Sequence, residues 1–430
     1  MKILMTVFEC MDIGGIGTDV DWKIRGLEEA GHKVDIIMLK NADMDMKMRG
    51  RTTQKGATDG PNGLQIHPRA GFFGLPIVSY GSKPRLKKLW KRFDKYDFII
   101  HEIPGPDPAK TKDGKGYWHR LYDHDVPQII SAHDANFRDL YPYLIKVADK
   151  IKGISCTNQA GYEALSWFPA PRAFIGAPHP VFDWDDMPDW DDRKARGICA
   201  HVWKAWKHMD YVVRAIPKLK DTSMIMCGDG IERNYMTSKD KCRERYEGIW
   251  EKATEAGMDY KGMLPADKLH KLYRNSRVMV DMAWSRKFEK LGCHFNRSII
   301  EGYNNGCVPI VVSENMIEEG FQLKMFKPGK THFEIKADHK PKELAQLIDH
   351  VANLPADEAD AIIRRGRKIL SKFFDYRVTS LQYIDLAKGK PAGVYPKLET
   401  GKLNKKIRAA AERYTAKVDR AIAKAQARKK

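Results

Sequence analysis

Two residues able to exchange protons or stabilise charge, His133 and Asp134, directly follow the short apolar run 128–132. Such a pair could stabilise a positive charge or act on an incoming hydroxyl group. If the run is a strand of a parallel sheet, both residues lie at the carboxyl edge, where open α/β sheets bind ligands. A single histidine there is more often structural, but the adjacent acid favours a functional pair. His101 and Glu102 end the neighbouring predicted strand and could face the same cleft.

A glycine-rich turn containing Gly14, Gly15 and Gly17 separates the first predicted strand from the first predicted helix. Glycines in such a turn let a phosphate or a sugar approach the backbone, and the helix N-terminus offers unpaired N–H donors. A dinucleotide fingerprint is disfavoured, because the third glycine is missing and the second strand ends at 39–41 without an acid for a ribose. The turn therefore indicates a phosphate or sugar site, with a structural tight turn as the alternative.

Residues of similar chemistry occur in the second half of the chain. Lys207 opens a predicted helix, Gly228 lies in a turn after a predicted strand, and Glu301 lies within a predicted helix. A lysine near a cleft can neutralise a diphosphate leaving group, and a buried carboxylate can accept ribose hydroxyls. Each residue alone is a weak signal, whereas their order and spacing are much stronger.

The elements that must position these residues alternate between strands and helices. Strands are predicted at 2–8, 34–39, 98–102, 128–132, 197–200, 223–227, 278–282 and 308–312. A helix is predicted from the glycine turn to about residue 30, and others at 210–218, 268–274, 298–304 and 341–352. This alternation predicts parallel, doubly wound sheets. The expected fold class is α/β, with two Rossmann-like halves facing one cleft.

Composition predicts the domain boundaries. The Asp-rich segment 183–192 has neither helical nor strand periodicity and predicts a linker between the halves. The expected parts are an N-terminal Rossmann-like domain, a C-terminal Rossmann-like domain, a crossover helix and a basic helical tail, at 1–182, 193–365, 366–387 and 388–430. Residues 40–80, interrupted by Gly and Pro, are interpreted as an insertion near the sheet edge.

Composition also excludes several classes of protein. A chain of 430 residues that is 43% hydrophobic can bury a normal core, which rules out wholesale disorder. No run approaches the roughly 18–20 apolar residues that span a bilayer, and the N-terminus lacks signal-peptide features. The seven cysteines form no C-x-x-C pair, which disfavours a disulfide framework or a thiolate zinc site. These features predict a cytoplasmic protein without stable membrane insertion.

The net charge of +19 indicates a polyanionic partner, either nucleic acid or an anionic membrane surface. Much of the charge is local, because residues 388–430 hold 14 Lys and Arg against 3 acids. The spacing of small apolar residues from 404 onward is helical, but the stripe is mostly alanine. Such a face inserts weakly into lipid and better fits a phosphate backbone or a partner.

The motif order from Lys207 through the Gly228 turn to the run from Glu301 to Pro309 resembles that of retaining GT-B glycosyltransferases with nucleotide-sugar donors. The resemblance covers the chain to about residue 387, including the first glycine turn and His133, and it implies that 1–182 is the acceptor-side domain and 193–365 the nucleotide-sugar-binding domain. It implies that Lys207 holds the diphosphate, Glu301 the ribose, and the glycines the donor phosphates or sugar. It also implies a UDP-sugar as donor, with no further cofactor.

The chain departs from the family pattern at two points. The family's arginine, five positions before the lysine, falls on Val202, so His201 or Lys204 could substitute for it. The first of the family's two acids is missing eight positions before Glu301. We assign its role instead to the run from Glu289 to Gly292, which looks like the family's Glu-Pro-Phe-Gly and would contact the sugar hydroxyls.

Within the family the likeness is closest in kind to the T-even phage enzymes that glucosylate 5-hydroxymethylcytosine in duplex DNA. Two basic stripes support a DNA partner independently. One has apolar residues at helical spacing on one face and cations on the other. For this first stripe, a solvated helix face is the alternative. The second stripe lies in a glycine-broken loop. The candidate DNA-binding residues are Lys83, Arg85, Lys87, Lys88, Lys91, Arg92, Lys115 and Arg120.

The expected reaction moves a sugar from a UDP-sugar to a hydroxymethylated pyrimidine in duplex DNA, and the resemblance implies retention of configuration. His133 and Asp134 would support the oxocarbenium-like state or the incoming hydroxyl. No Asp-x-Asp pair follows a strand as a metal-dependent transferase requires, so we expect no catalytic metal. Two alternatives remain: a cell-envelope glycosyltransferase with a lipid-linked or lipopolysaccharide acceptor, and a non-catalytic DNA-binding protein.

Overall fold

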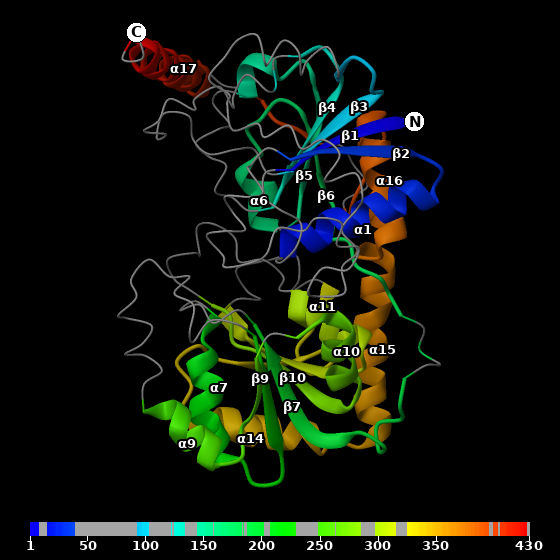
Figure 1. Ribbon diagram of the computed structural model, residues 1–430, viewed down its shortest axis with the longest axis vertical. Coiled ribbons are helices and arrows are strands. Elements are labelled where there is room, and N and C mark those ends of the chain that lie inside the picture. Colours follow the sequence, from blue (N-terminus) through cyan, green and yellow to red (C-terminus); the bar gives the residue numbers. More distant parts are fainter. Residues whose placement is uncertain are drawn as a thin grey trace. The chain divides into compact units, whose positions relative to one another are not determined.

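The chain forms two compact units, each built on its own β-sheet (Figure 1). Unit 1 comprises Met1–Gly60, Leu64–His179 and Phe373–Lys430, and unit 2 comprises Pro61–Gly63 and Pro180–Lys372. The computed structural model describes residues 1–7, 15–38, 93–102, 122, 124–133, 144–157, 159–182, 184, 187–201, 207–228, 248–262, 264–284, 297–314, 325–394, 399–402 and 405–427.

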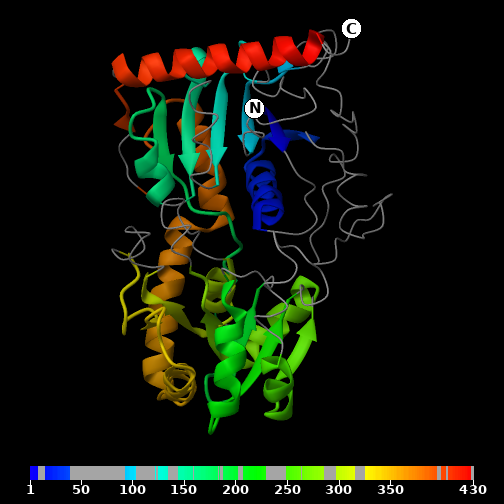
Figure 2. The same cartoon turned by 90° about the vertical axis from the view of Figure 1, so that its left-hand side faces the viewer.

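Unit 1 contains a seven-stranded sheet in the order β13-β6-β5-β4-β3-β1-β2 (Figure 2). Six strands are parallel, and β13 pairs antiparallel with β6 at one edge. The strands are β1 (Lys2–Val7), β2 (Lys33–Met38), β3 (Phe98–Glu102), β4 (Gln128–Ala132), β5 (Ile151–Cys156), β6 (Pro171–Phe174) and β13 (Glu399–Thr400). The buried strands β3 and β4 have the predicted bounds, as continuous apolar runs in parallel sheets should.

The helices of unit 1 come from both ends of the chain. They are α1 (Gly15–Glu29), α6 (Gln159–Ala164), α16 (Tyr376–Ala387) and α17 (Lys405–Ala427), with a 3-10 turn at Ile145–Val147. α1 and α16 lie side by side (Figure 1). Their close contact requires Gly26, because a Cβ there would lie 2.4 Å from the Ser380 hydroxyl. Helix α16, which follows all of unit 2 in the sequence, therefore completes the sheet domain of unit 1.

Unit 2 contains a six-stranded parallel sheet in the order β12-β11-β10-β7-β8-β9. Its strands are β7 (Lys194–Ala200), β8 (Ser223–Cys227), β9 (Asp259–Gly262), β10 (Ser276–Asp281), β11 (Val308–Val312) and β12 (Phe333–Ile335). Its helices are α7 (Met209–Ala215), α9 (Ile249–Glu255), α10 (Ala266–Arg274), α11 (Arg297–Asn304), α14 (Pro341–Ala352) and α15 (Ala356–Phe373).

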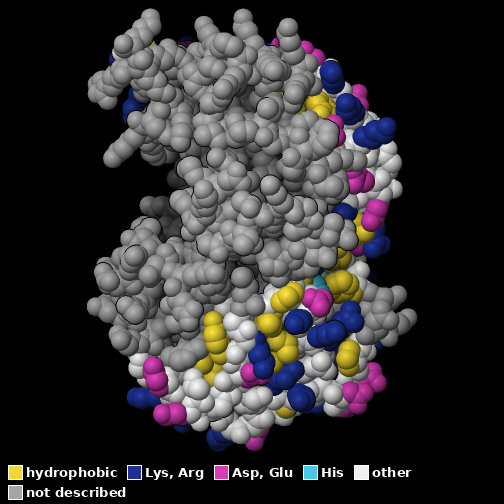
Figure 3. Space-filling view, in the orientation of Figure 1, with side chains coloured by type: hydrophobic (Ala, Val, Ile, Leu, Met, Phe, Trp, Pro, Cys, Tyr) yellow, Lys and Arg dark blue, Asp and Glu magenta, His cyan; other side chains and the backbone are white. Residues whose placement is uncertain are grey.

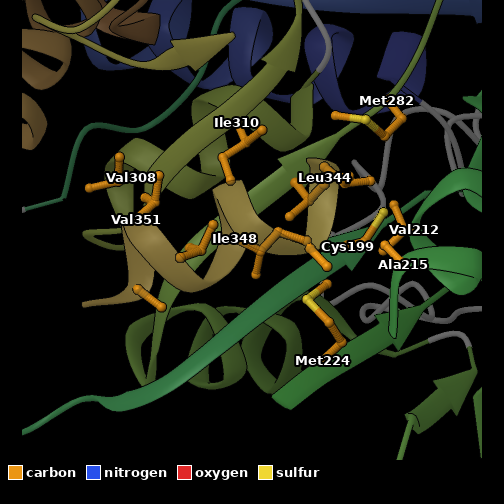
Figure 4. Packing of buried hydrophobic residues seen from close by; sticks show 14 of the residues in the cluster. Cys199, Val212, Ala215, Met224, Met282, Val308, Ile310, Leu344, Ile348 and Val351 are labelled. Carbon is orange, nitrogen blue, oxygen red and sulfur yellow. The ribbon is translucent and has the colours of Figure 1, made fainter. Parts of the chain in front are cut away.

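The core of unit 2 forms where helices cover the sheet (Figure 4). Ile310 of β11 and Met224 of β8 pack with Val212 of α7 and with Leu344 and Ile348 of α14. The apolar residues of α14 recur at helical spacing, which explains why its predicted bounds are correct.

Two expected helices differ in the structure. The helix predicted at 210–218 ends at Ala215 and continues as a 3-10 turn, Ile216–Lys218, because Pro217 has no N–H to extend the α-helix. The single helix expected at 366–387 is instead the end of α15 followed by α16. Asp375 caps the new helix by accepting a hydrogen bond of 2.9 Å from the Arg377 amide, so the helix restarts there. Among the described residues, no helix is both long and apolar enough to cross a membrane.

Candidate functional sites at the two sheet edges

His133 and Glu102 meet at the carboxyl edge of the unit 1 sheet. β3 ends at Glu102, which lies in register with Ser131 of β4, and His133 follows β4 by one residue. Both side chains are buried, and His133 Nε2 lies 2.7 Å from Glu102 Oε2. The predicted proximity of these two residues is therefore confirmed.

His101 does not share this edge site, which corrects the expectation that it could face the same cleft. Its Nδ1 lies 2.8 Å from the Thr6 hydroxyl, and its Nε2 lies 3.0 Å from Oε1 of Gln128. The reason is the strand period of two: successive side chains of β3 point to opposite faces, so only Glu102 reaches His133. Burial lowers the pKa of His101 well below its ordinary value, and nearby His124 lowers it further.

A buried lysine completes the contacts of Glu102. Lys23 of α1 forms an ion pair with Glu102 Oε1, lies 3.3 Å from the Ser131 hydroxyl and sits 4.1 Å from the centre of the Tyr383 ring. Burial by itself raises the pKa of Glu102, but the charge of Lys23 and the hydrogen bond from His133 overcome burial and lower it to about 2. Glu102 is thus ionised at neutral pH.

Asp19 lies on the other side of the His133 ring. Its Oδ2 is 3.6 Å from His133 Nδ1, while the Thr157 hydroxyl donates to the His133 carbonyl at 3.2 Å. The sequence interpretation did not include Lys23 or Asp19. A signal was present for Lys23, because it falls within the apolar stripe of α1. A charged residue inside such a stripe indicates a buried partner.

Unit 2 carries a second cluster, formed by His201, Asp281 and Ser298. His201 directly follows β7, Asp281 ends β10 and Ser298 lies in the first turn of α11. The Ser298 hydroxyl donates to Asp281 Oδ2 at 2.7 Å, and His201 Nε2 lies 3.2 Å from the same oxygen. Burial opposes ionisation of Asp281, but His201, Lys207 and the Ala283 amide together hold its pKa far below the usual range.

Lys207 and Gly228 lie at the same end of the unit 2 sheet. Lys207 is close enough for its charge to lower the pKa of Asp281. Gly228 has φ +127°, and a Cβ there would lie 1.7 Å from the His201 carbonyl oxygen. Two turns that follow adjacent strands approach each other so closely that only glycine fits. Gly228 therefore has a structural reason to be glycine, independent of any ligand.

Glu301 lies on α11, one turn after Ser298. Its side chain is 18% exposed, and its Oε1 lies 4.0 Å from Arg297 Nε. Burial raises the pKa of Glu301 to about 7, and Arg297 opposes that rise only in part. The other end of α11 is fixed, because Arg193 donates to the Asn305 carbonyl at 3.0 Å and Arg367 to the Asn304 carbonyl at 2.7 Å.

Of the remaining predicted site residues, two glycines lie in α1 and the others lie outside the described part of the chain. Gly15 begins α1 and Gly17 lies in its first turn, so the helix starts inside the glycine run. The donor-site candidates Gly14, Glu289 and Gly292, the catalytic candidate Asp134 and the possible substitute Lys204 lie outside the described residues. So do the insertion 40–80 and Lys83, Arg85, Lys87, Lys88, Lys91, Arg92, Lys115 and Arg120. Among the described residues, no group of His, Cys, Asp and Glu could hold a metal ion.

Comparison with known proteins identifies the fold. No family model matches the chain, and no curated protein matches it in sequence. Solved structures match 90% of the chain, among them an α-glucosyltransferase in complex with UDP and a 13-mer DNA containing an HMU base (TM-score 0.62, 12% identity, 99% of that chain). The chain has the GT-B glycosyltransferase fold.

Other solved glycosyltransferase structures match the chain to a similar extent. HepE from Anabaena, in complex with UDP, has a TM-score of 0.61 and 12% identity, with 100% of its own chain covered. Sucrose-phosphate synthase from Thermosynechococcus elongatus has a TM-score of 0.61 and 14% identity, with 98% of its chain covered. Both matches cover 90% of the present chain. Because identities are this low, the shared property is the fold.

Proposed function

We propose that this GT-B chain is a glycosyltransferase that moves a sugar from a UDP-sugar to hydroxymethylated pyrimidines in duplex DNA, with retention of configuration. The observation that carries the proposal is the match over 90% of the chain to an α-glucosyltransferase in complex with UDP and DNA. HepE in complex with UDP-glucose supports a UDP-sugar donor. Such a reaction would take place in the cytoplasm of a cell, a host cell if the gene is carried by a phage.

The donor would bind at the carboxyl edge of the unit 2 sheet. Lys207 supplies a positive charge for the diphosphate, which becomes more negative as the sugar leaves. Glu301 accepts hydrogen bonds from the ribose hydroxyls, which supply the donors that a half-buried carboxylate needs. Gly15 and Gly17 of unit 1, with Gly14, are the glycines proposed for the donor phosphates or sugar. Gly228 holds the turn after β8, while Glu289 and Gly292 would orient the sugar.

The acceptor proposal depends on charge. α17 carries seven Lys and Arg residues and two acids, and its described Lys and Arg side chains are exposed. In contrast, Lys and Arg are interspersed with Asp and Glu on the face of unit 2 seen in Figure 3. An exposed cationic helix fits the regular negative charges of a DNA backbone. Phosphate contacts could offset the few kcal/mol needed to flip a base out of the duplex.

In the proposed reaction the bond from the anomeric carbon to the diphosphate breaks, and a bond from that carbon to the hydroxymethyl oxygen forms. The proton of the hydroxyl leaves with the diphosphate. His133 follows β4 at the unit 1 edge, and together with Asp134 it would support the positive charge that develops on the sugar. Retention needs no enzymatic nucleophile in this scheme, so the paired carboxylates of glycosidases are not required.

The first experiment supplies purified protein with UDP-sugars and three DNA acceptors, containing hydroxymethylcytosine, hydroxymethyluracil or only unmodified bases. UDP release is measured, and the DNA is digested for nucleoside mass. Release that requires a modified base, with a hexose or pentose mass gain, supports the proposal and identifies both sugar and base. Release that is indifferent to DNA, or absent with every acceptor, favours an envelope acceptor instead.

The donor and DNA roles can be separated by two variants. Lys207→Ala should abolish transfer while DNA binding stays near wild type, whereas equal loss of both would make Lys207 structural. Removal of residues 405–430 should weaken DNA binding and flatten its dependence on salt. The truncation keeps β13, which pairs with β6, so the unit 1 sheet stays complete. An unchanged salt slope would contradict a DNA role for α17.

A further inference from the structure

We propose that Glu102 and Lys23 are positioning residues for His133. Glu102 holds the hydrogen of His133 on Nε2, Lys23 balances the charge of Glu102, and Nδ1 is thereby the ring nitrogen that can take up a proton. The kinetic part of this inference rests on the proposed function, whereas the assignment of the ring hydrogen does not.

The position of the hydrogen follows from the acceptor. An ionised carboxylate can only accept hydrogen bonds. Because the buried Lys23 ammonium pairs with Glu102 and keeps it ionised, the 2.7 Å contact with His133 Nε2 requires the hydrogen to be on that nitrogen. In the neutral ring the lone pair then belongs to Nδ1, on the side of Asp19.

The surroundings make this arrangement rigid. The Glu102 side chain is 0% exposed and that of Lys23 is 1% exposed, so bulk water does not screen either charge. The Thr157 hydroxyl donates to the His133 carbonyl, which fixes the backbone behind the ring. A buried pair of this kind costs desolvation free energy and is weak as a stabilising device. Because the Lys23–Glu102 pair lies against His133, we assign it the role of orienting that ring.

The cluster also joins separate elements of unit 1. Lys23 and Asp19 come from α1, whose first turn contains Gly15, and Tyr383 comes from α16. The Tyr383 hydroxyl lies 3.3 Å from the Ser131 hydroxyl and 3.2 Å from that of Ser155. The charged and polar groups that contact the His133 ring therefore come from β3, β4 and α1, and α16 joins this network through the contacts of Tyr383 with Ser131 and Lys23.

The direct test is ¹⁵N NMR of the His-labelled wild-type protein, with the His133 signals identified by their loss in His133→Gln. We expect the neutral ring to carry its hydrogen on Nε2. In Glu102→Gln the amide can donate as well as accept, so the preference should weaken and the signals should shift. The matched control is Glu29→Gln, which removes a carboxylate that bonds Tyr376 at the other end of α1. A wild-type His133 ring with its hydrogen on Nδ1 would overturn the proposal.

The kinetic test measures transfer to hydroxymethylated DNA. Glu102→Gln should lower kcat by about tenfold or more, because the His133 ring loses the orientation in which it supports the charge that develops on the sugar, while the KM for donor changes little. Lys23→Met should act in the same direction, and Glu102→Gln should add nothing in a His133→Gln background. If the effects of Glu102→Gln and His133→Gln on kcat were fully additive, Glu102 would not act through His133 and the positioning role would be overturned. If no variant or wild type transfers sugar, the proposed function fails while the NMR result still decides the ring assignment.

Discussion

Glu102 of unit 1 ends the parallel strand β3 and Glu301 of unit 2 lies on helix α11, and these two carboxylates have opposite surroundings. Glu102 of unit 1 is matched by Lys23 and His133, and its pKa falls to about 2. Glu301 of unit 2 has Arg297 at 4.0 Å, and its pKa rises to about 7. Asp281 of unit 2 resembles Glu102, because His201 and Lys207 favour its charge.

The difference separates two uses of a buried acid. A carboxylate whose charge the protein already matches gains little from a ligand, so it serves to hold its neighbours in place. A carboxylate that burial leaves poorly compensated gains from any ligand that brings hydrogen-bond donors. By this criterion Glu102 and Asp281 are holding residues, and Glu301 is the stronger candidate for direct contact with the donor.

The largest expected effect is on stability, from removal of the cation in unit 1. Lys23→Met leaves Glu102 buried without its cation and should cost about 3–5 kcal/mol. The matched control, Lys261→Met, removes an exposed ion pair with Asp259 and should cost less than about 1 kcal/mol. Urea unfolding of each variant measures the difference. Equal small losses of stability in both variants would show that Glu102 does not depend on Lys23 for charge compensation in the folded protein.

The corresponding change in unit 2 should have a smaller effect. Asp281→Asn keeps the shape of the side chain but removes the charge that His201 and Ser298 contact, so it should cost about 1.5–3 kcal/mol. The control is Asp349→Asn in the same unit. Asp349 accepts a hydrogen bond from the Lys220 amide at 3.0 Å at an exposed position, so its substitution should cost less free energy of unfolding. Urea unfolding followed by circular dichroism compares the two. A loss for Asp281→Asn no greater than that of the control would refute the comparison.

The pH dependence of stability should differ in sign between the two acids. The folded pKa of Glu102 lies below its ordinary value of 4.5, so its contribution is present above pH 4.5 and is lost as pH falls toward about 2. The folded pKa of Glu301 lies above 4.5, so its contribution is present below pH 4.5 and is lost as pH rises to about 7. The free energies of unfolding of wild type and Glu301→Gln, measured between pH 4.5 and about 7, test the contribution of Glu301. A difference between the two proteins that does not change with pH would contradict it.

The smallest effect concerns ligand affinity. Ribose hydroxyls donate to the ionised form of Glu301, so the affinity for UDP should rise, by up to about tenfold, as pH increases through 7. Titration calorimetry of wild type and Glu301→Gln tests this, since the variant should lose the pH dependence. The same slope in both proteins would exclude Glu301 as the group that titrates with UDP binding.

Local sequence determined much of the fold. Strands β3, β4, β8 and β11 and helix α14 have the predicted bounds, because buried parallel strands read as short apolar runs and α14 has a clear helical period. Strands β5 and β6 were missed, since Lys152 and Arg172 interrupt their apolar pattern. Arg172 is buried by its contacts with Tyr162, a tertiary feature that periodicity does not reveal.

Sequence alone also indicated that His133 and Glu102 end neighbouring strands, since that follows from chain order in a parallel sheet. Only the tertiary structure decided which side chains surround them. Lys23 is 79 residues from Glu102, and Tyr383 is 252 residues from Ser131. Their contacts depend on how α1 and α16 pack against the sheet, and helix packing is set by the shapes of whole surfaces rather than by any local pattern.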